Sequence, residues 1–187
     1  MELIITRHGE TEENLRGIIQ GHLPGKLSEE GIRQAKKLGK RFKDEKIDFI
    51  FSSDLDRAKN TAKEIIKFHP KTPFKLKRDL REVNWGELQG KKSLEIKDPI
   101  KRVKGIEKIE ETHKRAKKIV EYLLKNCNGK RVLIVTHGAF QSVLINHLIG
   151  EEITKKQKTE NTAVTIFSFS EIKKPKLALF NCTKHLR

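Results

Sequence analysis

The chain has 187 residues, of which 41 are Lys or Arg and 25 are Asp or Glu, so its formal net charge is +16. This length suits a single domain, residues 1–187, with a substantial buried core. The two cysteines, Cys127 and Cys182, exclude a disulfide framework. No apolar run approaches the roughly 20 residues of a membrane-spanning helix, and no secretory signal precedes the first strand, so we expect a cytoplasmic protein without a membrane partner.

Short apolar runs alternate with longer amphipathic runs in the first half of the chain. Residues 3–6 and 47–53 predict buried strands, and residues 74–80 alternate in a way typical of an edge strand. A first helix is predicted within residues 26–47. Ser28 would cap it, and the residues near its buried face would be Ile32, Ala35, Leu38 and Phe42. A second helix is predicted over residues 56–68.

The second half continues the alternation. After residue 90 the pattern weakens through Gly105, where loops or a short excursion are expected, and a long helix follows over residues 106–124. Residues 131–138 contain the clearest buried strand, a helix follows it, and residues 163–169 and 176–181 form a closing hairpin. Strands that alternate with helices predict an α/β fold: a three-layer α/β/α sandwich around a mostly parallel sheet, with one antiparallel edge strand.

Ligands of such sheets bind beyond the carboxyl ends of the strands. Arg7 and His8 follow the first predicted strand, Arg57 comes soon after the second, and His137 follows the strand at residues 131–136. Each of these residues alone more often has a structural role. Together, at three strand ends, they indicate a site that binds a phosphoryl group, because arginines neutralise its oxygens and an imidazole can attack phosphorus.

Six blocks of the sequence carry a family resemblance. They are "RHGET" with Asn14 after it, "LSEEGIRQA", "SSDLDRAKNTA", "REVNWGELQG", "VTHG" and "NTAVTIF". In this order they resemble the motifs of the histidine phosphatase superfamily, in its phosphoglycerate-mutase-like branch. The resemblance extends from residue 3 to about residue 167, which is nearly the whole chain.

The resemblance implies a role for each matching residue. His8 would be the phosphorylated nucleophile, Glu82 the general acid and base, and Arg7, Arg57 and His137 the other members of the phosphate pocket. Four further positions would bind the phosphate or line its rim: Asn14, Gln20, Gly21 and Gly138, the last through its backbone amide.

The chemistry expected of these groups needs no cofactor and no metal. Unprotonated His8 would attack while its other ring nitrogen is held by a backbone carbonyl, and Gly9 would leave room for an oxyanion. The positive charges of Arg7, Arg57 and a protonated His137 would neutralise the transferring group. Protonated Glu82 would give its proton to the leaving alkoxide and then take one from water.

Two neighbours of these groups are assigned smaller roles. Asp54 would orient Arg57, and Trp85 would line the mouth of the site if it is not simply packed in the core.

Three functions remain open. The first is a metal-independent phosphomonoesterase that acts on a small phosphorylated metabolite, as a monomer or homodimer. The second is a phosphoglycerate mutase, which the short interval of 55 positions between Glu82 and His137 disfavours, because it leaves only a shortened lid at residues 86–106. Basic residues of that lid would still attract a second anionic group: Lys91, Lys92, Lys101 and Arg102.

The third function is a basic nucleic-acid-binding protein. Its only support is the charge, which attracts polyanions but equally suits a solvated lysine-rich surface. With 6% aromatic residues there are few rings on which bases could stack, so nucleic acid is an unlikely partner.

Overall fold

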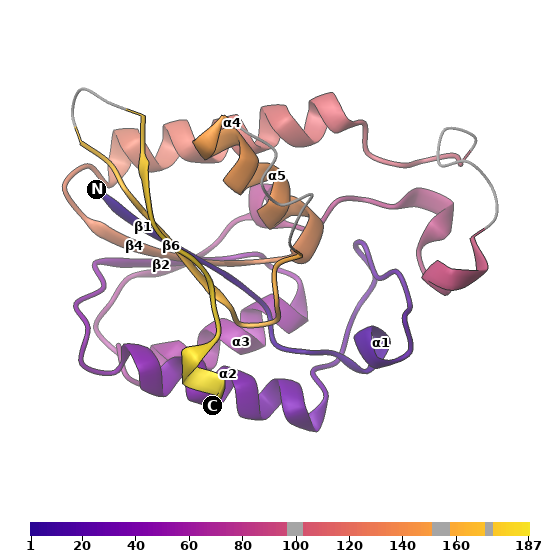
Figure 1. Cartoon of the computed structure of the whole chain (residues 1–187), viewed down its shortest axis with the longest axis horizontal. Coiled ribbons are helices and arrows are strands. Elements are labelled where there is room, and N and C mark those ends of the chain that lie inside the picture. Colours follow the sequence, from indigo (N-terminus) through magenta and orange to yellow (C-terminus); the bar gives the residue numbers. More distant parts are fainter. Residues whose placement is uncertain (97–102, 151–157, 171–173) are drawn as a thin grey trace.

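The computed structural model describes the whole chain except residues 97–102, 151–157 and 171–173. Its centre is a six-stranded sheet in the order β3-β2-β4-β1-β5-β6 (Figure 1). The strands are β1 (Glu2–Arg7), β2 (Phe49–Ser52), β3 (Phe74–Leu76), β4 (Arg131–Thr136), β5 (Val164–Ser168) and β6 (Lys176–Cys182). The first four strands run parallel, and β5 runs antiparallel to both β1 and β6. The predicted parallel sheet is confirmed, and its antiparallel part is the hairpin at one edge.

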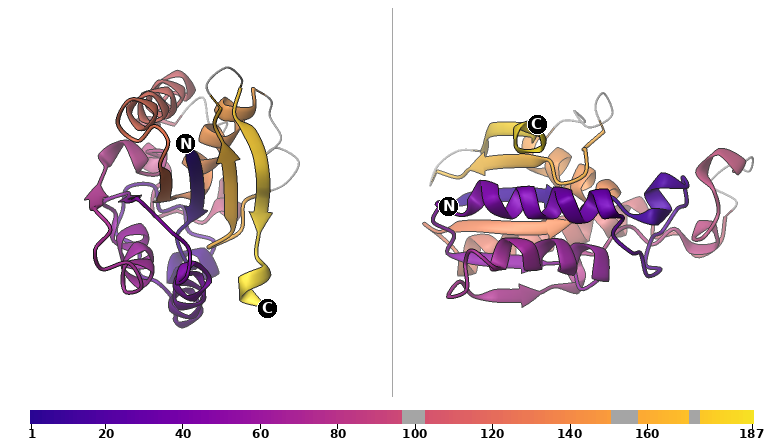
Figure 2. Two further views of the ribbon diagram at one scale, coloured as in Figure 1. Left: turned by 90° about the vertical axis from the view of Figure 1, so that its left-hand side faces the viewer. Right: turned by 90° about the horizontal axis from the view of Figure 1, so that it is seen from below.

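Helices cover both faces of the sheet. They are α2 (Glu29–Phe42), α3 (Asp56–Ile66), α4 (Ile109–Asn126) and α5 (Gly138–Ile149), whereas the single-turn α1 (Glu12–Leu15) lies in the loop after β1. Figure 2 shows α2 and α3 on one face and α4 and α5 on the other. Strand β1 is buried on both sides: Leu3 and Ile5 pack in the core beneath α4 and α5, and Ile4 packs in the core beneath α2 and α3. The predicted three-layer sandwich is thus confirmed.

Two helix details differ from the predictions. Ile32 is 40% exposed, because Gly31 rather than Ile32 turns toward the preceding loop, where an added Cβ would lie 1.9 Å from the carbonyl oxygen of Glu10. Helix α4 begins at Ile109 rather than at residue 106, where the Glu111 carboxylate accepts a hydrogen bond of 3.3 Å from the backbone N–H of Lys108. Ile106 instead pairs with Trp85 in an isolated β-bridge.

The predicted lid at residues 86–106 extends from the end of the sheet where the parallel strands finish (Figure 1). Its described part contains two 3₁₀ turns, η2 (Gly86–Leu88) and η3 (Ser93–Glu95). Lys92 bridges to Ile18 in the loop after α1, so lid and loop pack together. Two of the basic residues predicted to attract a second anion, Lys101 and Arg102, lie outside the described residues.

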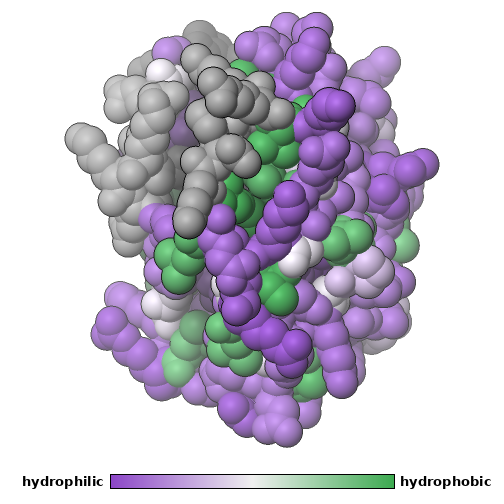
Figure 3. All heavy atoms as spheres, turned by 90° about the vertical axis from the view of Figure 1, so that its right-hand side faces the viewer, coloured by the Kyte–Doolittle hydropathy of each residue, from purple (hydrophilic) through white to green (hydrophobic). Residues whose placement is uncertain are grey.

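The surface at this end of the molecule is largely hydrophilic, with separate hydrophobic areas between the polar side chains (Figure 3). Among the described residues, no helix has the length and apolar character required to cross a membrane.

Candidate active site

The parallel strands bring the predicted site residues to one place. In the register of the sheet Arg7 lies beside Thr136, and Ser52 lies beside Val135, so the ends of β1, β2 and β4 are level. A cavity of about 380 Å³ opens there. Its lining residues are Arg7, His8, Asn14, Ile18, Ile19, Gln20, Gly21, Arg57, Glu82, Trp85 and Lys158. Hollows elsewhere on the molecule are larger, but they do not contain this set of cations and a histidine.

His8 is held in one tautomer. Its Nδ1 lies 2.7 Å from the carbonyl oxygen of Gly9, and because a carbonyl only accepts, Nδ1 carries the proton. The lone pair is therefore on Nε2. Burial, together with the positive charges of Arg57 and Arg7, lowers the pKa of His8 well below its usual 6.5. The predicted carbonyl contact is confirmed, and at neutral pH His8 is an uncharged base.

His137 packs against His8, with ring centroids 5.2 Å apart. The Nε of Arg57 donates a hydrogen bond of 3.2 Å to its Nδ1, so this nitrogen carries the lone pair and Nε2 carries the proton. That Nε2 is buried and has no partner among the described residues. Burial, with the charge of Arg57, lowers the pKa of His137. The expectation of a protonated His137 is therefore wrong for this structure, where the ring is neutral.

Arg57 is almost completely buried, with 1% of its surface exposed. Its Nη1 donates to the carbonyl oxygen of Leu23 at 3.0 Å and its Nη2 to that of Gly21 at 2.7 Å. Burial lowers its pKa to about 10, so it remains a cation at neutral pH. The expected orienting contact from Asp54 is wrong, because that carboxylate forms a two-bond ion pair with Arg81, at 2.7 and 2.6 Å.

Arg7 is the last residue of β1 and directly precedes His8. Its Nη1 donates to the carbonyl oxygen of Thr159 at 2.9 Å, and its buried Nε has no partner among the described residues. A Cβ added to Gly138 would lie 3.3 Å from the Arg7 guanidinium. Glycine at position 138 thus allows this guanidinium to lie against the first turn of α5, whose backbone N–H groups attract anions.

Glu82 is bound to the same turn. Its Oε1 accepts hydrogen bonds from the backbone N–H groups of Val83 and Phe140, both at 2.9 Å, and its Oε2 accepts one from Ala139 at 3.2 Å. These three backbone donors hold the carboxyl group against the N-terminus of α5, at the wall of the cavity. From there it can exchange a proton with a bound ester or with water.

The predicted rim residues lie around the cavity. Asn14 caps its own helix, since its Oδ1 accepts from the backbone N–H of Thr11 and its backbone N–H donates to Thr11 Oγ1. Gln20 donates to the same hydroxyl at 2.8 Å, and its buried Oε1 has no partner among the described residues. Gly21 adopts a φ of 52°, which turns its carbonyl to Arg57. Trp85 also lines the cavity, as predicted.

Glycine is required at position 9 for a different reason from the one predicted. A Cβ at this position would lie 2.5 Å from the carbonyl oxygen of Gly31, at the start of α2. The glycine is thus required for close packing of the loop against that helix, and the expectation that it leaves room for an oxyanion is wrong. Its backbone N–H donates to Thr61 Oγ1 at 3.0 Å, which fixes the chain beside His8.

Comparison with known proteins identifies the family. The model of the histidine phosphatase superfamily (branch 1) matches residues 3–183. The chain belongs to this superfamily. The structure of Bacillus stearothermophilus YhfR resembles it with a TM-score of 0.91 and 27% identity, covering 100% of this chain and 99% of that one.

Named phosphatases are among the similar proteins. A mutant phosphoserine phosphatase from Entamoeba histolytica, solved in complex with phosphoserine, gives a TM-score of 0.87 at 30% identity, over 100% of this chain and 99% of that chain. A metal-independent phosphoserine phosphatase of Arabidopsis thaliana is 36% identical over 158 residues, which are 73% of this chain and 64% of the relative. The chain is therefore a phosphatase of the histidine phosphatase superfamily.

The sequence analysis missed a group of residues that hold Glu82 in this phosphatase. Arg115, on α4, donates to the carbonyl oxygens of Asp79 at 2.9 Å and Arg81 at 2.7 Å, and it forms a two-bond ion pair with Glu107, both bonds at 2.9 Å. The side chains of this pair are only 16% and 13% exposed. Arg115 and Glu107 thereby fix the acid loop, residues 78–84, to the start of α4. Arg115 and Glu107 meet residues 78–84 only through the conformation of loops, and loops leave no periodic pattern in the sequence.

His22 supports the acid loop from the other side. Its Nε2 lies 2.8 Å from the carbonyl oxygen of Glu82, and its backbone N–H donates to Gln89 at 2.6 Å. This histidine is therefore a bracing residue of the loop.

Removing the Arg115 side chain is expected to lower kcat by about 10- to 100-fold, because an error of about 1 Å in the placement of a catalytic group has an effect of this size. Stability should fall by about 3 kcal/mol, since Glu107 would remain partly buried without its partner. Steady-state kinetics and urea unfolding of Arg115→Ala measure both effects, and Arg115→Lys should retain part of the activity.

The matched control is Lys118→Ala, one turn along α4, whose ion pair with Asp79 is exposed and should contribute almost nothing. In a Glu82→Gln background, Arg115→Ala should cause little further loss of kcat. A full additional loss there would show that Arg115 does not act through Glu82.

The two neutral histidines also predict how stability depends on pH. In the unfolded chain His8 and His137 would bind protons near pH 6.5, whereas their pKa values in the folded protein are well below this. Their contribution to stability is therefore fully present above pH 6.5 and is lost as the pH falls, with a slope of about 1 kcal/mol per pH unit for each histidine. Urea unfolding between pH 7.5 and 5.5 measures this slope, which should be smaller in His137→Asn. An unchanged slope in that variant would contradict the prediction.

Proposed function

We propose that this phosphatase hydrolyses a small phosphomonoester through a phosphohistidine on His8, without a metal ion. The observation that carries the proposal is the tautomer of His8, whose Nδ1–H donates to the carbonyl oxygen of Gly9 so that Nε2 has a free lone pair at the cavity. A neutral, buried imidazole between two guanidinium groups is a suitable nucleophile for a phosphoryl group that already carries negative charge.

In the first step, Nε2 of His8 attacks phosphorus, the N–P bond forms and the ester P–O bond breaks. Charge on the transferred group is neutralised by Arg7 and Arg57, and the buried Nε2–H of His137, which has no partner among the described residues, is a further donor. These three groups supply the role that a metal ion has in other phosphoryl-transfer enzymes.

The leaving oxygen needs a proton if it departs as an alkoxide. Glu82 lines the cavity, and three backbone hydrogen bonds hold its carboxyl group there. The second pKa of a phosphate monoester is about 6, so the monoanionic form of the substrate brings one proton into the site. We infer that Glu82 takes this proton and passes it to the leaving oxygen.

In the second step, Glu82 removes a proton from water, the water oxygen attacks phosphorus and the N–P bond breaks. Inorganic phosphate leaves as its monoanion with the proton that Glu82 took from water, so Glu82 returns to its starting state. His8 is regenerated in its starting tautomer, since Nδ1 has kept its proton throughout. The cavity of about 380 Å³ is at the small end of ligand sites, which favours a small phosphorylated metabolite as substrate. The similarity to two phosphoserine phosphatases supports the same class.

The proposal is tested by hydrolysis of nitrophenyl phosphate in excess chelator, followed by alkaline quenching after one turnover. We expect undiminished hydrolysis and a label from the substrate's phosphorus on His8, as a phosphoramidate that survives alkali and is lost in acid. Activity that disappears with chelator and returns with a divalent metal would refute metal independence. A first turnover without any labelled histidine would refute the covalent intermediate.

A further inference from the structure

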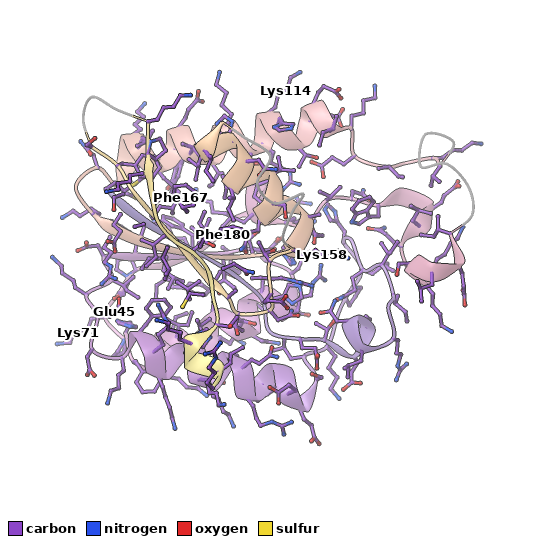
Figure 4. The ribbon with its side chains drawn as sticks, in the orientation of Figure 1. Glu45, Lys71, Lys114, Lys158, Phe167 and Phe180 are labelled. Atoms are coloured by element: carbon purple, nitrogen blue, oxygen red, sulfur yellow. The ribbon has the colours of Figure 1, made fainter. Side chains whose placement is uncertain are left out.

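Lys158 is a cation of the cavity that none of the steps above uses. It lies at the end of the sheet where the site opens, just before β5 (Figure 4). Arg7 and Arg57, the other basic residues of the lining besides His8, are buried and hydrogen-bonded to backbone carbonyls. In the described part of the chain, the Lys158 ammonium has no ion pair or hydrogen bond, and the residue is exposed.

The backbone around Lys158 is fixed on two sides. Arg7 donates to the carbonyl oxygen of Thr159, so the segment is attached directly to the guanidinium beside His8. Asn181 donates through Nδ2 to the carbonyl oxygen of Lys158 at 3.1 Å, and its Oδ1 accepts from the backbone N–H of Glu160 at 2.9 Å. The backbone from Lys158 to Glu160 is thus held by hydrogen bonds from both sides.

The position of Asn181 depends on an irregularity in the hairpin. The register of β5 and β6 shifts between Val164 and Ile166, and Asn181 has a φ of 47°, a left-handed conformation that asparagine tolerates better than most residues. Its backbone N–H donates to Thr165 Oγ1 at 3.2 Å. A bulge commonly redirects a side chain near an active site, and here both Oδ1 and Nδ2 of the Asn181 side-chain amide contact residues 158–160.

The remaining wall of the cavity contains Ile18, Ile19 and Trp85, which offer no charge. A substrate whose phosphate is bound by Arg7 and Arg57 therefore shares the cavity with these apolar side chains and with the unpaired ammonium group of Lys158. Within this lining Glu82 is the acidic residue, and it is already bound to the first turn of α5.

We propose that Lys158 binds a second anionic group on the substrate, a carboxylate or a second phosphate a few bonds from the phosphoryl group that is transferred. This inference rests on the proposed function. It assigns the binding of a second anion to Lys158, which lines the cavity, rather than to the basic residues of the predicted lid. Selectivity arises because a substrate without the second anion makes no contact with the Lys158 ammonium group and so gains no binding free energy from it.

The test compares substrates that differ only in the second group: 3-phosphoglycerate, which has a carboxylate, 1,3-bisphosphorylated glycerol, which has a second phosphate, and glycerol 3-phosphate, which has neither. The variants are Lys158→Met, Lys158→Arg and, as a matched control, Lys71→Met on the surface beyond α3 (Figure 4). We expect Lys158→Met to raise KM about 10-fold for at least one of the doubly anionic substrates, as loss of one charged hydrogen bond implies. The kcat/KM for glycerol 3-phosphate should change less than about two-fold.

Lys158→Arg should keep the preference, because it keeps the charge, and Lys71→Met should change nothing. The doubly anionic substrate that loses its advantage in Lys158→Met identifies the anion as carboxylate or phosphate. The inference is overturned if Lys158→Met leaves all three substrates unchanged, or if it weakens all three equally. Hydrolysis of glycerol 3-phosphate by the unmodified protein keeps these outcomes separate from a failure of the proposed function, which would abolish turnover of every substrate.

Discussion

His8→Ala is expected to lower kcat/KM by about four orders of magnitude or more, because removal of a covalent nucleophile has effects of this size. The remaining cations, Arg7 and Arg57, would still bind the phosphate group. KM or the affinity for inorganic phosphate should therefore change far less than kcat. Steady-state kinetics with nitrophenyl phosphate and phosphate binding by calorimetry measure the two quantities separately.

The control for this variant is His113→Ala, which removes an exposed histidine on α4 and should retain full activity. Thermal unfolding of both variants shows whether the fold is intact. If folded His8→Ala kept activity within about 100-fold of the unmodified protein, water would be attacking the substrate directly, with the oxyanion donors alone giving the residual rate.

Glu82→Gln is expected to separate the two chemical steps. With nitrophenyl phosphate the leaving group departs without a proton, so the first turnover should stay rapid. The second step needs the missing base, and the rate after the first turnover should fall by about 10²- to 10⁴-fold. Rapid-mixing absorbance should therefore show a burst of one nitrophenolate per protein molecule.

With an alkyl phosphate the same variant should show no burst, because the leaving alkoxide now lacks its proton donor. Glu87→Gln, which replaces an exposed carboxylate in the neighbouring 3₁₀ turn, is the matched control and should behave as the unmodified protein. An equal loss of the first turnover with both substrates would mean that Glu82 positions the site and transfers no proton.

Much of the fold and the centre of the site were predictable from local patterns. The alternation of short apolar runs with amphipathic runs predicted the parallel sheet, because buried parallel strands and helices with one buried face have distinct periods. The rule that ligands bind beyond the ends of parallel strands then predicted that His8, Arg57 and His137 meet. The cavity lined by His8, Arg7, Arg57 and Glu82 agrees with this.

Protonation states and supporting contacts were not predictable in this way. The sequence places positive groups together, but whether His137 is charged depends on its burial and on the direction of the Arg57 N–H bond. Likewise, Asp54 is close to Arg57 in the chain, yet it binds Arg81, which lies in a different loop. Such contacts join segments without a period, so sequence spacing contains no information about them.

By itself, the amino-acid sequence determined the layers of the fold and the set of groups that gather at the ends of β1, β2 and β4, because both follow from periodicity and chain order. Only the tertiary structure decided which nitrogen of His8 is free, why position 9 must be glycine, and which cation faces the mouth of the cavity. The first feature depends on a hydrogen bond to the adjacent Gly9, whose direction only the folded loop sets. The other two depend on contacts between residues far apart in the chain, Gly9 with Gly31 and Asn181 with Lys158. Burial and hydrogen-bond direction arise only once such segments have packed.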